Sequence, residues 1–148
     1  MRISLEEFIR SGQLGPIKIG LSRNEVKTAF GEPNQWHSKS PSWKTANIWK
    51  YGDTEFHFRA DKLWMIFFDE FDIPNVGDKL ELDAWGLSNQ VTLSQMESKL
   101  KVAEINYHCE QFSSDNERIL LVSQAKTTLS FERQNDETLH LYSIFSTS

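Results

Sequence analysis

Gly15-Pro-Ile-Lys-Ile-Gly-Leu-Ser-Arg-Asn-Glu-Val-Lys-Thr-Ala-Phe-Gly-Glu-Pro33 contains a helix with both of its ends encoded. Ser22 stands at the N-cap position and Glu25 follows three residues later, which is the spacing of a capping box. Gly31 predicts a left-handed C-cap, and Pro33 prevents the helix from continuing. The apolar residues at helical spacing between these ends are Val26, Ala29 and Phe30. The stretch therefore predicts a short amphipathic helix that begins after Ser22.

The segments on either side of this helix complete a helix-and-strand unit. Ser4-Leu-Glu-Glu7 is another capping box, and it predicts a short helix that ends near Gly12. Residues 34–46 are polar and predict a loop with a short strand around Trp36. Three strand candidates separated by tight turns follow, and they are Asn47–Tyr51, Thr54–Arg59 and Leu63–Asp69. This pattern predicts an antiparallel meander.

The same plan restarts in the second half of the chain. Leu93-Ser-Gln-Met-Glu97 repeats the spacing of Leu21–Glu25 and predicts a helix capped by Ser94 and Glu97. Four strand candidates follow, and they are Asn106–Phe112, Arg118–Ser123, Thr127–Glu132 and Thr138–Phe145. Turns are predicted at residues 113–116 and 134–136. A chance similarity is the alternative to a true repeat, because a helix followed by hairpins is a common arrangement.

These elements predict one α+β domain over residues 1–148. Its repeat halves, residues 14–72 and 88–148, are joined by an acidic linker at residues 73–87. Each half consists of one helix and an antiparallel meander. We expect the two halves to form an open, curved sheet with the helices on one face.

Alternation along the strands separates two faces of the predicted sheet. Thr54–Arg59 aligns with Thr127–Glu132, and Leu63–Ile66 aligns with Leu139–Tyr142. The residues expected under the helices are Phe56, Phe58, Leu63, Met65, Leu129, Phe131, Leu139 and Leu141. The residues expected on the opposite face are Glu55, His57, Arg59, Trp64, Ser130, Glu132, His140 and Tyr142. This mixed polar and aromatic surface is the predicted docking face.

Composition excludes several classes of function. Hydrophobic residues make up 39% of the 148, so the chain can bury a core. The net charge of −5 disfavours nucleic-acid binding through phosphate contacts and permits a basic protein partner. One cysteine, Cys109, excludes an intrachain disulfide, and we expect it to be a partly buried thiol. No segment has the apolar length of a signal peptide core or a membrane span, which predicts a cytoplasmic protein.

The sequence lacks the common catalytic motifs. It has no glycine-rich phosphate loop, paired CxxC, HExxH or GxSxG. His57 and His140 with Glu55 or Glu132 are a conceivable metal site, but solvent-exposed or hydrogen-bonded histidines are the favoured interpretation. We therefore predict no catalytic residue, no metal site and no cofactor.

Among the paired carboxylates, Asp69-Glu70 is distinguished by three neighbouring phenylalanines, Phe67, Phe68 and Phe71. One interpretation is a carboxyl group with a raised pKa that acts as a general acid. The favoured interpretation is a solvated strand end within an acidic segment. That segment is either a simple linker or a docking edge for a Lys/Arg-rich partner.

The candidate partner-binding residues come from three sources. Tryptophans are frequent interface hot spots, and three of the five are expected to be exposed anchors. The acidic segment and the predicted docking face supply the others. The complete set is Trp43, His57, Trp64, Asp69, Glu70, Asp72, Trp85, His140 and Tyr142.

The motif from Gly20 to Pro33 resembles the opening motif of the SmpA/OmlA (BamE-like) proteins, in which a capped helix ends at Gly-x-Pro. The doubled helix-and-meander plan is similar to that of the β-lactamase-inhibitor protein. The stretch also resembles small bacterial proteins associated with toxin-neighbouring genes. The chain departs from the BamE-like pattern, because it shows no signal sequence and no lipid-bearing cysteine near its start. Both named relatives act by binding other proteins, which implies the same class of activity here.

We expect a non-catalytic protein-binding module, in its sharpest form an immunity or inhibitor protein that neutralises a basic bacterial toxin. The alternative is a small-ligand-binding protein or hydrolase that uses a pocket around His57, Glu55 and Trp64. A deep pocket with converging polar groups would favour the alternative, and a broad shallow surface would favour the binding module.

Overall fold

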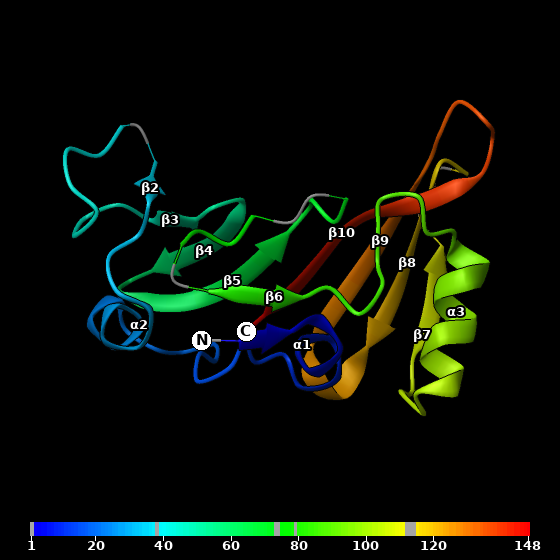
Figure 1. Ribbon diagram of the computed structural model, residues 1–148, viewed down its shortest axis with the longest axis horizontal. Helices are drawn as coiled ribbons and strands as arrows, with labels where there is room; N and C mark the ends of the chain where they lie inside the picture. The colour runs from blue at the N-terminus through cyan, green and yellow to red at the C-terminus, as the bar shows by residue number, and fades with distance from the viewer. Residues whose placement is uncertain (1, 38, 73–74, 79, 112–114) are drawn as a thin grey trace.

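A computed structural model describes residues 2–37, 39–72, 75–78, 80–111 and 115–148. Within these ranges the chain forms three α-helices and two β-sheets, which confirms the α+β fold class. The larger sheet is antiparallel and has eight strands in the order β2-β3-β4-β5-β10-β9-β8-β7. Figure 1 shows α2 and α3 near opposite ends of this sheet, with α1 between them.

Each half of the large sheet is a meander that follows one helix. The first half contains α2 (Arg23–Phe30), β2 (Gln35–Trp36), β3 (Ile48–Tyr51), β4 (Thr54–Arg59) and β5 (Lys62–Phe68). The second half contains α3 (Leu93–Val102), β7 (His108–Gln111), β8 (Glu117–Val122), the short 3-10 helix η1 (Ser123–Ala125), β9 (Thr127–Arg133) and β10 (Leu139–Thr147). The halves meet where Met65–Phe68 of β5 pairs with Ile144–Thr147 of β10.

The pairing register is the same in both halves. Phe58 pairs with Leu63 in the first hairpin, and Phe131 pairs with Leu141 in the second. In each hairpin a β-bulge comes next along the later strand, with Trp64 and then Tyr142 as the unpaired residue. The residues that follow are paired again, so Trp64 and Tyr142 occupy equivalent positions.

This register corrects the alignment of Leu63–Ile66 with Leu139–Tyr142. Leu63 is equivalent to Leu141, because the turn before β10 is longer than the turn before β5. The bulge also places Met65 opposite His57, so Met65 is half-buried on the open face and not under the helices. Leu139 is half-buried as well. Superposition of the two halves as a repeat stays a prediction.

The start of α3 is another correction. The N-cap is Thr92, whose side chain accepts a hydrogen bond from the backbone of Gln95, while Ser94 and Glu97 lie within the helix. The Gln95 side chain accepts a bond from the Thr92 backbone and completes a capping box two residues earlier than predicted. The cap of α2 is confirmed at Ser22.

The helices cover one face of the sheet and bury its alternate side chains. Phe30 of α2 lies 5.7 Å from Tyr51 and 5.8 Å from Phe56, measured between ring centroids. Helix α1 (Leu5–Ser11) is capped by Ser4 and ends at Gly12, and its Phe8 ring lies 5.2 Å from Phe68. The predicted core residues that are buried are Phe56, Phe58, Leu63, Leu129, Phe131 and Leu141. None of the helices within the described ranges is long and apolar enough to cross a membrane.

A small parallel sheet, which the sequence did not predict, pairs β1 (Arg2–Ser4) with β6 (Glu81–Asp83). Strand β6 lies inside the predicted acidic linker, so that segment packs against the N-terminus. Some predicted features lie outside the described residues. They are linker residues 73, 74 and 79, the end of one predicted strand at Phe112, and turn residues 113 and 114.

Candidate functional site

A groove lies on the uncovered face of the sheet, across β8, β9 and β10. Its volume is about 330 Å³, and its walls include the aromatic side chains of Tyr142 and Phe145. Tyr142, the unpaired bulge residue of β10, is 47% exposed. Ser130 and Ser143 also line the groove, and their hydroxyl oxygens lie 2.5 Å apart. The groove therefore combines an exposed aromatic wall with small polar side chains.

Two carboxylates stand side by side at the same groove. Glu117 and Glu132 line it and are direct cross-strand partners between β8 and β9. Like charges in this arrangement repel each other. In the part of the chain that the structure describes, neither carboxylate has a side-chain hydrogen bond or ion pair. Arg118 also lines the groove, and its Nη1 donates to the backbone carbonyl of Glu117 at 2.7 Å.

The equivalent surface of the first half is closed by its own side chains. His57 Nε2 lies 2.9 Å from Glu55 Oε1, and this bond is the main reason that the pKa of the Glu55 carboxyl is lowered. The guanidinium of Arg59 lies 4.4 Å above the ring centroid of Trp64, and the His57 ring meets the same indole at 6.0 Å. The groups expected to line a pocket are thus bonded to or stacked on one another.

His140 does not lie on the docking face in an accessible position. Its exposed fraction is 7%, its Nδ1 lies 2.9 Å from the Gln90 carbonyl oxygen, and its Nε2 lies 2.9 Å from Asp136 Oδ2. The bond to Asp136, followed by the bond to Gln90, raises the pKa of this imidazole. His140 is thus buried and hydrogen-bonded, while its role in binding a partner stays a prediction. Among the described residues, no group of three His, Cys, Asp or Glu side chains is placed to hold a metal ion.

Three tryptophans expected to be exposed are half-buried. Trp43 packs edge-on against Trp49, and its carbonyl oxygen accepts a bond from the Trp49 indole at 2.6 Å. Trp85 lies under the ammonium group of Lys99, 4.6 Å from the ring centroid, and Trp64 is covered by arginine as described above. The expectation of exposed anchors is wrong for all three, while a role in binding a partner stays a prediction.

The more exposed aromatic residues are Trp36 and Tyr142, at 36% and 47%. Trp36 lies in the edge strand β2, and its indole nitrogen donates to the Ser40 carbonyl oxygen at 3.0 Å. Because β2 has only two residues and a polar sequence follows it, no periodicity was available from which the exposure of Trp36 could be predicted. Cys109, expected to be partly buried, is exposed. Partial desolvation of its thiol, followed by the charge of the nearby Glu97, raises the pKa of that thiol.

Hydrogen bonds hold two acidic side chains of the segment at the end of β5. Asp72 Oδ1 accepts a bond from the Asn89 backbone at 2.8 Å, and Glu70 Oε1 accepts one from the Asp72 backbone at 3.0 Å. Asp69 is exposed as a residue. Partial desolvation of its carboxyl group, followed by repulsion from Glu55 and Asp53, raises the pKa of that carboxyl. Two of the three predicted carboxylates therefore hold the chain in place.

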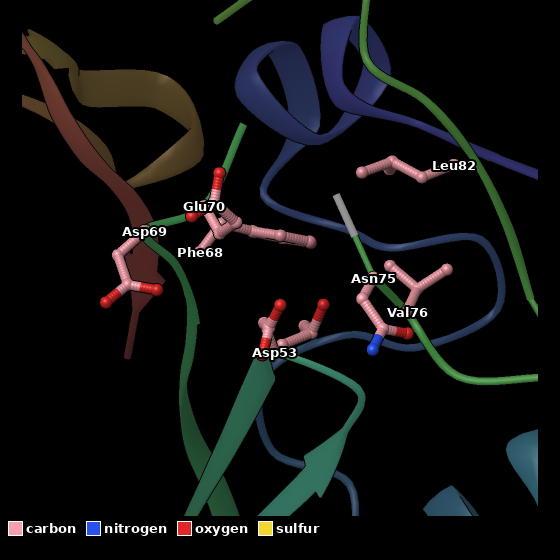
Figure 2. A pocket seen from close by; sticks show the side chains of 8 residues that line it. Asp53, Phe68, Asp69, Glu70, Asn75, Val76 and Leu82 are labelled. Carbon is pink, nitrogen blue, oxygen red and sulfur yellow. The ribbon is translucent and has the colours of Figure 1, made fainter. Parts of the chain in front are cut away.

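A narrow cleft borders this acidic segment. Figure 2 shows Phe68 pointing toward Val76 and Leu82, while the Asp69 carboxylate points away from them. The cleft does not admit a water molecule. It offers no room in which Asp69 or Glu70 could act on a substrate as a general acid.

Comparison with known proteins leaves the family open. No model of a known protein family and no curated protein matches the sequence. The chain is similar in structure to a DUF4309 family protein (YjgB) from Bacillus subtilis, with 14% sequence identity and a TM-score of 0.38 over 86% of this chain and 78% of that protein. This similarity is distant. The resemblance to the BamE-like proteins stays a sequence-based expectation.

Proposed function

We propose that this chain is a non-catalytic protein-binding module that docks a basic protein on the uncovered face of its sheet. The observation that carries the proposal is the groove across β8, β9 and β10, where Tyr142 is 47% exposed. Exposed tyrosine is a frequent hot-spot residue, because it desolvates a large area and loses little side-chain entropy. The neighbouring Glu117 and Glu132 provide charge complementarity to a basic partner.

The finer form of the proposal is an immunity or inhibitor protein that works in the cytoplasm and neutralises a basic toxin by covering it. Such a protein needs a preformed surface and no chemistry of its own. The eight-stranded sheet provides a continuous surface, and the net charge of −5 favours encounter with a cationic partner. The alternative of a ligand pocket around His57, Glu55 and Trp64 gains no support from side chains that contact each other.

The experiment compares three immobilised proteins as bait in lysate of the host organism. They are the wild type, Tyr142→Asp in the groove, and Val102→Asp as a matched control on helix α3, where Val102 is 86% exposed. We expect the wild type and the control to retain the same basic protein, and Tyr142→Asp to lose at least tenfold in affinity when that protein is purified and titrated. Equal binding by all three baits would contradict docking on this face.

A further inference from the structure

We propose that the groove across β8, β9 and β10 binds an arginine side chain of the partner protein. This inference rests on the proposed function and specifies the residue type that the partner inserts. The guanidinium would stack on Tyr142 and pair with Glu117 and Glu132, all of which line the groove. The chain thus supplies both the aromatic ring and the two carboxylates that such a guanidinium would contact.

The first half of the protein contains a stacked arginine and aromatic pair at the equivalent positions. Arg59 follows Phe58, just as Glu132 follows Phe131, and the paired register makes these positions equivalent. Trp64 and Tyr142 are likewise the equivalent bulge residues. In the first half the guanidinium of Arg59 covers Trp64 at 4.4 Å, so the chain places its own arginine on the aromatic side chain.

The second half lacks the corresponding arginine. Glu132 stands at its position, so the site has an acidic group where the first half has a basic one. Tyr142 is 47% exposed, whereas Trp64 under Arg59 is half-buried. An arginine from outside would therefore restore the stacking that Arg59 provides in the first half.

The charges favour a cation at this place. Glu117 and Glu132 face each other across neighbouring strands and outnumber Arg118, which also lines the groove, so a guanidinium between them would replace repulsion with attraction. Arginine suits the site better than lysine, because its planar group stacks on aromatic rings and donates two parallel bonds to a carboxylate. The groove volume of about 330 Å³ accommodates the side chain, and Ile119 and Phe145 provide apolar contact for its methylene groups.

The test uses two small probes and needs no knowledge of the partner. Uniformly ¹⁵N-labelled protein is titrated with N-acetyl-arginine amide, and separately with N-acetyl-citrulline amide, which has nearly the same shape and no charge. We expect the arginine probe to shift backbone amides of β8, β9 and β10 around Tyr142 and Ser130, with an affinity that falls as salt is added. The citrulline probe should bind at least tenfold more weakly.

The matched variants are Glu117→Gln with Glu132→Gln, and as a control Glu32→Gln with Glu104→Gln at exposed positions elsewhere. The groove variant should weaken arginine binding at least tenfold, and the control should leave it unchanged. Equal binding of both probes, shifts confined to other surfaces, or no shifts at all would overturn the inference. If a partner protein is captured and its affinity is unaffected by the groove double variant, the arginine site fails while the docking function stands.

Discussion

Two acceptors favour the charged form of His140. Its ring nitrogens face the Gln90 carbonyl and the Asp136 carboxylate, each at 2.9 Å. These contacts raise the pKa of the imidazole, and the backbone of Thr138 and the His140 ring lower the pKa of the Asp136 carboxyl. The pair ties β10 to the turn before it and to the segment before α3.

The pair makes stability depend on pH with a defined sign. The raised pKa of His140 stabilises the fold below the unfolded value of about 6.5, and this contribution is lost as pH rises through the folded value. The lowered pKa of Asp136 stabilises the fold above the unfolded value of about 3.9, and this contribution is lost as pH falls through the folded value. We expect Asp136→Asn to lower the pKa of His140, as measured by NMR titration of the ring.

Urea denaturation provides the corresponding stability measurement. Asp136→Asn should reduce the free energy of unfolding more at pH 5.5 than at pH 8, because the imidazolium loses its carboxylate partner only where it is charged. An equal reduction at the two pH values, together with an unchanged His140 titration, would contradict the role assigned to this contact.

Helix caps set the boundaries of the two helices that begin the halves. Leu21 and Val91 precede the caps Ser22 and Thr92, and their carbonyl oxygens accept bonds from the backbones of Leu63 and Leu141, each at 2.8 Å. Each cap is thereby joined to the sheet at the residue before the bulge. The cap therefore fixes both the start of the helix and its position on the sheet.

The position of the second cap is tested by two neighbouring hydroxyl groups. Thr92→Ala should lower the free energy of unfolding by about 1 kcal/mol, because the Gln95 backbone loses its acceptor. Ser94→Ala should change it by less than about 0.5 kcal/mol, since Ser94 lies within the helix. Thermal or urea unfolding of both variants measures the difference. The reverse order of effects would restore Ser94 as the cap.

Local signals explain which elements the sequence predicts well. Strand β4 coincides with its predicted range, and β3, β5, β8, β9 and β10 agree with theirs within two residues at each end. These strands are well predicted because turn residues and alternating hydrophobicity depend only on neighbouring residues in the sequence. Strands β1 and β6 have three residues each, which is too short to show a period. The bulges at Trp64 and Tyr142 depend on pairing between strands, so alternation alone assigned Met65 to the wrong face.

The candidate site was predicted only in part for the same reason. Tyr142 was correctly placed on the uncovered face, while the burial of His140 depends on Gln90, which lies far away in the sequence. The exposure of tryptophans was mispredicted because their polar sequence neighbours do not reveal the cations that cover them, such as Lys99 above Trp85. Contacts between distant segments decide accessibility, and composition does not.

At the scale of the whole molecule, the negative charge should act on the rate of association. Asp69 and Asp72 are exposed at the end of β5, and a basic partner approaching this edge would be attracted before contact. We expect Asp69→Asn with Asp72→Asn to slow association several-fold at low salt, with little difference at high salt. The side-chain amide oxygen that Asp72→Asn introduces can still accept the bond from the Asn89 backbone, so the fold should be retained.

Stopped-flow association with the purified partner measures this effect. The control is Glu32→Gln with Glu104→Gln, which removes the same charge from other exposed positions. Equal on-rates for the two double variants at low salt would show that net charge, and not the acidic segment at the end of β5, governs encounter. Such a result would leave the segment as a structural connection between the halves.

The open sheet has one further consequence, which concerns aggregation. A sheet that is not closed into a barrel leaves an unpaired backbone edge at each end, where other chains can add as strands. Here the edge strands are β2 and β7, with two and four residues in the described ranges, and β7 carries His108 and Glu110. Short edges offer few backbone groups to a second chain, and the carboxylate of Glu110 opposes its approach. Within the described residues, the open sheet thus exposes little backbone to which a further strand could add.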